Sequence, residues 1–284
     1  HLEAITPLID EALNQAGLGK KELQAIAVTN GPGLVGALLV GVSNAKAFAY
    51  GLNLPLVPVN HILAHVYANF LVHDHIPFPL VALVVSGGHS SLLYLEDSRK
   101  IKTIGRTRDD AAGEVFDKIA RALNLGYPGG PLIQELARRG NPEAINFPRA
   151  YLDEKHLFDF SFSGLKSAVL NYINRYEREE IDGNEADIVA SFQAAVVEVL
   201  VAKTIDAATR LRAAGILLAG GVAANESLRH SLATASAKKH IPFYMPPIDL
   251  CTDNAAMVAA TAYPLYCDGV SAAYDLNADP SLQL

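Results

Sequence analysis

Two histidines spaced four residues apart are the first feature of this sequence that could do chemistry. Residues 60–65 read NHILAH, and in a helix His61 and His65 share one face. Two imidazoles at this spacing can bind one divalent cation, with bonds of ~2.0–2.1 Å for zinc. An ordinary surface pair is the alternative. Ile62 stands where HExxH zinc peptidases carry their general-base glutamate, which favours a Lewis-acid or positioning role over amide hydrolysis.

Asp253 is the carboxylate that could complete such a site. It lies in the run Cys251-Thr252-Asp253-Asn254, directly before an apolar helical stretch. Two interpretations stay open. Asp253 caps the helix N-terminus, or it supplies a third, oxygen ligand beside His61 and His65 and leaves one coordination position for substrate.

Three glycine-rich turns could bind an anion or a nucleotide. Residues 86–91 (SGGHSS) separate two apolar strands and form either a main-chain cradle for phosphate or carboxylate or a plain hairpin. Residues 126–131 (GYPGGP) follow a helix that carries Asp117, which is either an acceptor for a sugar hydroxyl or an ordinary charge on the helix surface. Residues 219–225 (AGGVAAN) join a strand to a helix. Their glycines either let the main chain contact a flat ring of a ligand or only allow close packing.

The elements that must position these residues alternate between helices and strands, which indicates an α/β fold with largely parallel sheets. Thr6 and Asn60 are expected helix caps, and Gly17 and Gly51 are expected helix stops. Residues 141–186 are expected to be an irregular, partly mobile insertion. We expect helices at 7–16, 35–50, 61–71, 111–124, 131–139, 187–213, 225–237 and 254–266, and strands at 25–28, 56–59, 80–85, 90–95, 216–219 and 242–245.

Composition narrows the class of protein. The chain has 284 residues, of which 50% are hydrophobic and 19% charged, so disorder is excluded and about two domains are expected. No apolar run approaches the ~18 residues of a membrane span. Two cysteines favour a reducing compartment, the cytoplasm. The net charge is −7, but residues 99–178 hold 14 basic and 10 acidic side chains. This middle region, near Arg138 and Arg139, could face a polyanion.

Taken together, seven motifs occur in one order over nearly the whole chain. The motifs are NGPG, NHxxxH, SGGHSS, DDAAGEVFDKIAR with LGYPGGP, FSFSGLKSAV, AGGVAANESLR and CTDNAAM. With these motifs the sequence closely resembles the tRNA adenosine threonylcarbamoyltransferase family, formerly called O-sialoglycoprotein endopeptidases. The resemblance implies an α/β fold of the actin/sugar-kinase/Hsp70 type, with two ribonuclease-H-like domains at residues 1–76 plus 254–284 and at 77–253.

The resemblance also implies site residues. His61, His65 and Asp253 match the family's ligands for one divalent metal ion, usually iron or zinc. A second set matches the contacts to the substrate, threonylcarbamoyl-AMP, or to an adenine nucleotide. This set is Val84, Val85, Ser86, Gly87, Gly88, Asp117, Gly130 and Asn225.

The implied reaction transfers the threonylcarbamoyl group from threonylcarbamoyl-AMP to N6 of the adenosine 3′ of the anticodon, in tRNAs that read codons starting with A. The substrate adenosine lies in a single-stranded loop, where proteins usually read RNA. Bacterial members work with a catalytically inactive paralogue of the same fold and a small P-loop ATPase. The resemblance therefore implies a cytoplasmic enzyme with these partners and tRNA, and no membrane association.

One departure and three alternatives accompany the resemblance. The family normally opens with a strand hairpin carrying a Gly-Ile-Glu-Thr-Ser-Cys-like segment, and His1 is not preceded by it, so the first domain is expected to be truncated. A non-catalytic scaffold paralogue is not expected to keep His61, His65 and Asp253 together. An actin-like ATPase or sugar kinase needs no paired histidines. A metallopeptidase is disfavoured by Ile62.

Overall fold

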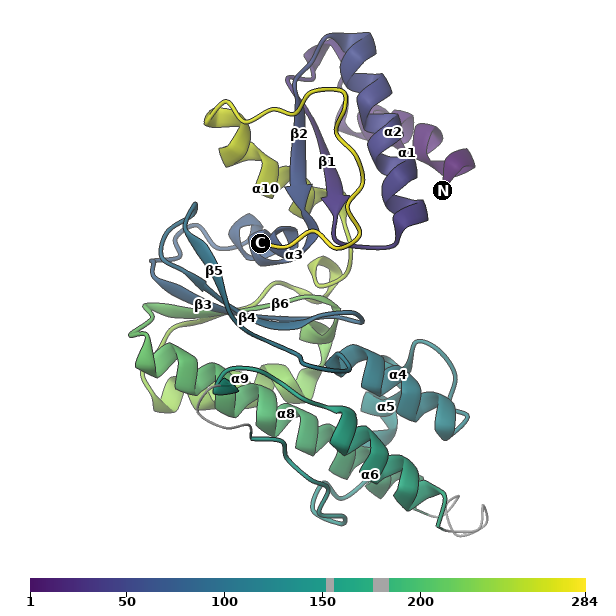
Figure 1. Ribbon diagram of the computed structural model, residues 1–284, viewed down its shortest axis with the longest axis vertical. Helices are drawn as coiled ribbons and strands as arrows, with labels where there is room; N and C mark the ends of the chain where they lie inside the picture. Colours follow the sequence, from purple (N-terminus) through teal and green to yellow (C-terminus); the bar gives the residue numbers. More distant parts are fainter. Residues whose placement is uncertain (152–155, 176–183) are drawn as a thin grey trace. The chain divides into compact units, whose positions relative to one another are not determined.

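The computed structural model describes residues 1–151, 156–175 and 184–284. These residues form two compact units. Unit 1 comprises residues 1–71 and 254–284, and unit 2 comprises residues 72–253. Figure 1 shows helices and strands in both units. The protein therefore has an α/β fold, and its larger sheet mixes parallel and antiparallel strands.

Unit 1 is built on two parallel strands. Strand β1 (Ile26–Gly31) pairs with β2 (Leu56–Asn60), and helix α2 (Val35–Leu52) connects them, as a parallel pair requires. The core between α2 and the two strands contains Val28, Val42 and Leu56. The remaining elements of unit 1 are α1 (Leu2–Ala16), η1 (Lys20–Glu22), α3 (His61–Tyr67), η2 (Ala68–Leu71) and α10 (Ala255–Cys267).

Unit 2 contains a mixed sheet with the strand order β5-β4-β3-β6-β7. Strand β3 is antiparallel to β4 and parallel to β6. All six residues of β3 are buried, which explains their unbroken apolar run. The strands are β3 (Leu80–Val85), β4 (Ser90–Leu95), β5 (Ile101–Arg106), β6 (Gly215–Ala219) and β7 (Phe243–Tyr244). The helices are α4 (Ala112–Ala122), α5 (Gly129–Ala137), α6 (Ser163–Ile173), α8 (Glu185–Arg210), η4 (Gly221–Ala224), α9 (Glu226–Lys238) and η5 (Ile248–Leu250).

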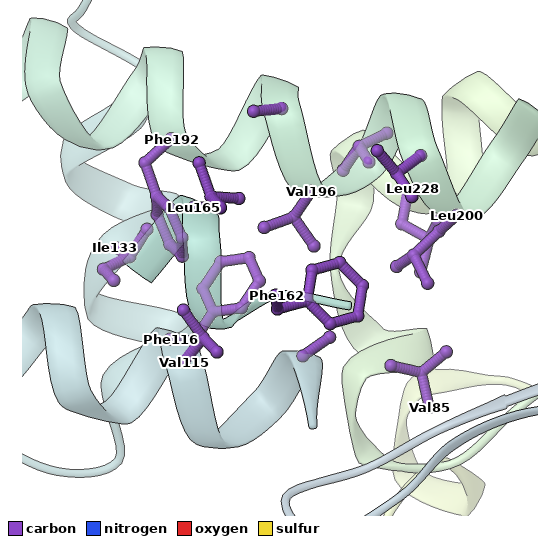
Figure 2. Packing of buried hydrophobic residues seen from close by; sticks show 14 of the residues in the cluster. Val85, Val115, Phe116, Ile133, Phe162, Leu165, Phe192, Val196, Leu200 and Leu228 are labelled. Atoms are coloured by element: carbon purple, nitrogen blue, oxygen red, sulfur yellow. The ribbon is translucent and has the colours of Figure 1, made fainter. Parts of the chain in front are cut away.

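The core of unit 2 lies between the sheet and its helices (Figure 2). Phe116 of α4 and Phe192 of α8 meet edge to face, with ring centroids 5.0 Å apart. Phe162, directly before α6, is 1% exposed and packs in the same cluster. This cluster joins α4, α6 and α8 into the support on which the loops at the ends of β3 and β6 rest.

Most elements predicted from the sequence are confirmed, with four corrections. Helix α1 starts at Leu2, so Thr6 is not its N-cap, and Pro7 lies inside the helix. Helix α2 runs past Gly51 to an αL residue at Asn53. Strand β5 was not predicted. The segment 141–186 is not wholly irregular, because α6 lies within it; residues 152–155 and 176–183 of this segment lie outside the described residues.

Within the residues that the structure describes, two helices, α2 and α8, are long and apolar enough to span a membrane. The expectation that no apolar stretch approaches this length is therefore wrong. In α8 72% of the apolar window is buried inside the protein, as in a core helix, against 22% in α2. Length and composition of this kind are weak indications of a membrane.

Candidate functional site

The short helix α3 positions the two histidines. Asn60 caps it, because its side-chain oxygen accepts hydrogen bonds from the main-chain N–H groups of Ile62 and Leu63, at 2.9 and 3.2 Å. The predicted cap is thus confirmed. His65 is only 2% exposed, and its ring centroid lies 4.7 Å from that of His61. The helix therefore presents two imidazoles side by side.

Asp253 lies one residue before the cap of α10. The cap is Asn254, whose side-chain oxygen accepts a hydrogen bond of 2.8 Å from the N–H group of Met257. The interpretation of Asp253 as the helix cap is therefore wrong.

His61, His65 and Asp253 each offer one ligand atom, and these atoms lie within 4.8 Å of one another. Two imidazole nitrogens and one carboxylate oxygen suit zinc or ferrous iron better than the hard cations calcium and magnesium, which prefer oxygen alone. Three protein ligands leave a coordination position for substrate. The residues present therefore fit one divalent transition-metal ion.

The turn between β3 and β4 is closed by hydrogen bonds at its base, and its tip is exposed. The Ser86 N–H group donates to the carbonyl of His89 at 2.8 Å, and the His89 N–H group donates to the Ser86 hydroxyl at 3.2 Å. Gly87 and Gly88 are exposed, with open space where a side chain would begin. Val84 and Val85, in contrast, are fully buried. Only their main chain can reach a ligand.

Two further glycines let backbone approach this turn closely. A Cβ atom on Gly113 would lie 2.5 Å from the Ser86 carbonyl oxygen, and one on Gly220 would lie 2.4 Å from that of Val85. Gly220 also has a φ of 90°. The start of α4 and the turn after β6 therefore both lie against the end of β3. Main-chain groups from three segments therefore gather there.

Asp117 lies on α4 and contacts the start of α5, where Gly130 lies. The Asp117 carboxylate accepts a hydrogen bond of 2.8 Å from the Gly129 N–H group. Gly129 also lies so close to α4 that a Cβ would be 2.7 Å from the Phe116 carbonyl oxygen. Gly130 faces open space. Asp117 thus orders the helix start, and only its second oxygen is left for a ligand hydroxyl.

Asn225 caps α9. Its side-chain oxygen accepts from the Leu228 N–H group at 3.0 Å, and its amide nitrogen donates to the Gln193 side-chain oxygen at 2.7 Å. Asn225 is 8% exposed. Gln134 of α5 accepts from the Glu226 N–H group at 2.8 Å. Gln193 and Gln134 were missed from the sequence, because single glutamines on helices carry no signal of what they contact.

The FSFSG motif is organised by a carboxylate outside it. Asp109 accepts hydrogen bonds from the Ser161 hydroxyl at 2.5 Å and from the N–H group and hydroxyl of Ser163 at 3.2 and 2.8 Å. Burial acts to raise the pKa of Asp109, but the hydrogen bonds outweigh it and hold the pKa below its usual range. The neighbouring Asp110 forms ion pairs with Lys118 and Lys166. The two carboxylates anchor the start of α6.

The side chain of Arg138, which was expected to face a polyanion, already forms two ion pairs within the protein. Its guanidinium contacts Glu135 at 2.6 Å and Glu226 at 2.7 Å. Arg139 is exposed.

Neither cysteine forms a disulfide, and burial raises the pKa of Cys251, so its thiol is a poor nucleophile.

A model of the family described as tRNA N6-adenosine threonylcarbamoyltransferase matches residues 1–260. A protein of that name from Moorella thermoacetica is 57% identical over 284 residues, which cover 100% of this chain and 83% of that protein. Relatives of the same name from Desulfitobacterium hafniense and Symbiobacterium thermophilum are 54% and 53% identical, over 83% and 82% of their lengths.

Solved structures show a similar fold at low identity. A crystal structure of T. kodakarensis HypF superposes with a TM-score of 0.65 at 16% identity, covering 91% of this chain and 42% of that one. A full-length HypF in a phosphate- and nucleotide-bound form has a TM-score of 0.60 at 14% identity, covering 77% of this chain and 44% of that one. At such identities the likeness concerns the fold alone.

Proposed function

This chain belongs to the tRNA N6-adenosine threonylcarbamoyltransferase family, and we propose that it transfers the threonylcarbamoyl group of threonylcarbamoyl-AMP to N6 of the adenosine 3′ of the anticodon. The observation that carries the proposal is the match over residues 1–260, with 57% identity to a relative across the whole chain. The substrate tRNAs are those that read codons starting with A.

The chemistry needs an activated acyl donor and positioned polar groups. The exocyclic amine attacks the carbamoyl carbon, the bond from that carbon to the phosphate oxygen breaks, AMP leaves and the amine loses a proton. The carbamoyl group is joined to phosphate as a mixed anhydride, so no enzyme nucleophile is needed. This agrees with the buried, protonated thiol of Cys251.

His61, His65 and Asp253 are proposed to hold one divalent ion, iron or zinc. Such an ion supplies Lewis-acid polarisation and an anchor for the donor. Support comes from the three ligand atoms within 4.8 Å of one another and from Asn254, which takes over the helix cap. Ile62 in place of a general-base glutamate argues against peptide hydrolysis.

The AMP part of the donor is proposed to bind along the ends of β3 and β6. The N–H groups of Gly87 and Gly88 face the phosphate, and preorganised donors of this kind are worth ~2.7–4 kcal/mol each in oxyanion sites. The other residues proposed to contact the AMP part are Ser86, Asp117, Gly130 and Asn225. Val84 and Val85 contribute main chain only, since their side chains are in the core.

A finer assignment of the fold is also proposed. The larger sheet has three antiparallel strands, β5-β4-β3, followed by the parallel β6 and β7. This order supports a ribonuclease-H-like domain of the actin/sugar-kinase/Hsp70 type for unit 2. We propose a second such domain for unit 1, where β1 and β2 form the parallel pair.

tRNA, a catalytically inactive paralogue of the same fold and a small P-loop ATPase are the proposed partners, in the cytoplasm. The decisive experiment incubates the chain with these partners, a divalent metal, threonylcarbamoyl-AMP and unmodified tRNA, and measures tRNA nucleosides by mass spectrometry. We expect N6-threonylcarbamoyladenosine with the wild-type protein and little with Asp253→Ala. Equal product from both proteins at low free metal contradicts the metal assignment, and no product from either contradicts the reaction.

A further inference from the structure

Arg229 of α9 contacts two separate segments, at three points, with one guanidinium group. Its Nη1 donates to the Ala223 carbonyl at 3.0 Å and lies 3.6 Å from the Cys251 sulfur, and its Nη2 donates to the Pro246 carbonyl at 2.9 Å. The side chain is half-buried. It therefore connects η4 with the 246–251 loop at the start of α9.

Each of the two segments leads to a proposed site residue. Ala223 lies in η4, the turn that leads to Asn225. Pro246 and Cys251 begin and end the loop that leads to Asp253. Cys251 is fully buried, and its sulfur also lies 3.5 Å from the Pro247 carbonyl oxygen. The loop is thus folded around the guanidinium, with Asp253 only two residues beyond the contact.

The partners of Arg229 are carbonyls and a thiol rather than carboxylates. Among the residues that the structure describes, Arg229 forms no salt bridge. A planar fork with five donors can reach acceptors in several directions at once, whereas a lysine ammonium acts as a point charge on a flexible stem. The contacts of Arg229 therefore serve to hold backbone in place.

We infer that Arg229 is a positioning residue for Asp253: it fixes the 246–251 loop against η4 and so sets the place from which Asp253 reaches the cation. The inference rests on the proposed function, because that assigns Asp253 as a ligand. The same contact ties the cation site to the turn that carries Asn225. Groups that orient metal ligands typically contribute ~10–100-fold in metal affinity.

Cobalt binding to the full chain tests the inference, since Co²⁺ replaces zinc or iron and has a coordination-sensitive visible spectrum. Arg229→Lys keeps the charge and most of the stem. We expect it to raise the Co²⁺ dissociation constant about tenfold and to change the spectrum. Arg210→Lys is the matched control, because the exposed Arg210 forms an ion pair of 2.8 Å with Asp206, one turn earlier on α8. A folded Arg229→Lys protein with wild-type affinity and spectrum overturns the inference.

Two further results separate the possible failures. If Asp253→Ala binds Co²⁺ as the wild type does, the ligand assignment of the proposed function fails, whatever Arg229 does. If Arg229→Lys does not fold, hydrogen exchange in the unsubstituted protein decides. Co²⁺ is then expected to slow amide exchange at residues 221–225 as well as at 249–253, with residues 206–210 as control. Unchanged exchange at 221–225 overturns the inference.

Discussion

The imidazole rings of His61 and His65 lie 4.7 Å apart between centroids and are inclined by 66°. Both belong to a helix of only seven residues, so the cap at Asn60 matters more to their alignment than it would in a long helix. Side chains four residues apart on a helix lie on the same face, and His65 is almost completely buried. The helix thus holds the two imidazole rings side by side.

Replacing either histidine of this pair is expected to abolish tight metal binding. His61→Ala and His65→Ala each remove one of three ligands, so we expect the Co²⁺ dissociation constant to rise by at least about tenfold, as for losses around metal sites generally. Affinity should also fall with acidification, because imidazole binds a metal only in its neutral form. Titration followed by visible absorption measures both effects. His230→Ala, at an exposed position of α9, is the control, and equal losses in all three variants contradict the assignment.

Asp253 and Asn254 are neighbours with different expected roles, and substitution separates them. Asn254→Ala removes the cap of α10 and should lower the free energy of unfolding by about 1 kcal/mol. Asp253→Ala should leave the stability of the metal-free protein almost unchanged and reduce metal affinity and transfer together. Denaturant unfolding and Co²⁺ titration of both variants measure this. A destabilised Asp253→Ala protein with normal metal binding contradicts the division of roles.

Gly87 and Gly220 form a matched pair for the proposed phosphate contact. Gly87→Ala meets no neighbouring atom, so the fold should persist while affinity for AMP falls. Gly220→Ala places a Cβ 2.4 Å from the Val85 carbonyl oxygen at a φ of 90°, and should destabilise unit 2 by several kcal/mol. Thermal unfolding and AMP titration measure both. Unchanged AMP affinity in Gly87→Ala would place the phosphate elsewhere.

The hydrogen bonds to Asp109 predict a specific dependence of stability on pH. Its pKa is lowered in the folded state from 3.8, so its contribution to stability is fully present above about pH 4. That contribution is lost as the pH falls through the lower folded value. Asp109→Asn should lower the free energy of unfolding at neutral pH and flatten its fall below pH 4. Urea unfolding from pH 2 to 7 tests this, and identical curves for both proteins refute it.

The elements that could be predicted from the sequence are those whose pattern lies within a few consecutive residues. The buried strand β3 and the cap at Asn60 were predictable. An apolar run and a polar residue before a helix can be recognised without knowing which distant residues they contact. Strand β5 was not, since Lys102 and Thr103 are exposed on an edge strand whose pairing with β4 contains a bulge. A helix inside the segment 141–186 was hidden for a similar reason, because the Asp109 carboxylate that anchors α6 lies more than fifty residues before it.

The candidate site shows the same limit. The spacing of His61 and His65 is local, so their pairing was predictable from the sequence. Adjacent Asp253 and Asn254 are both good caps, and only geometry decides between them. The hydrogen bond between Asn225 and Gln193, which are 32 residues apart in the chain, depends on tertiary packing. The contacts of the Arg229 guanidinium depend on it too. Such contacts leave no periodic pattern in a single sequence.

The salt dependence of tRNA binding should distinguish two adjacent arginines. Each cation that contacts a phosphate contributes about one unit to the slope of log affinity against log salt. Arg138 is already bound to Glu135 and Glu226, so Arg138→Gln should leave the slope unchanged. If Arg139 faces the tRNA, Arg139→Gln should lower the slope by about one unit. Filter binding from 50 to 300 mM salt measures both variants; an equal loss in Arg138→Gln would mean that its ion pairs open on binding, and no change in either would place the phosphate contacts on another surface or on a partner.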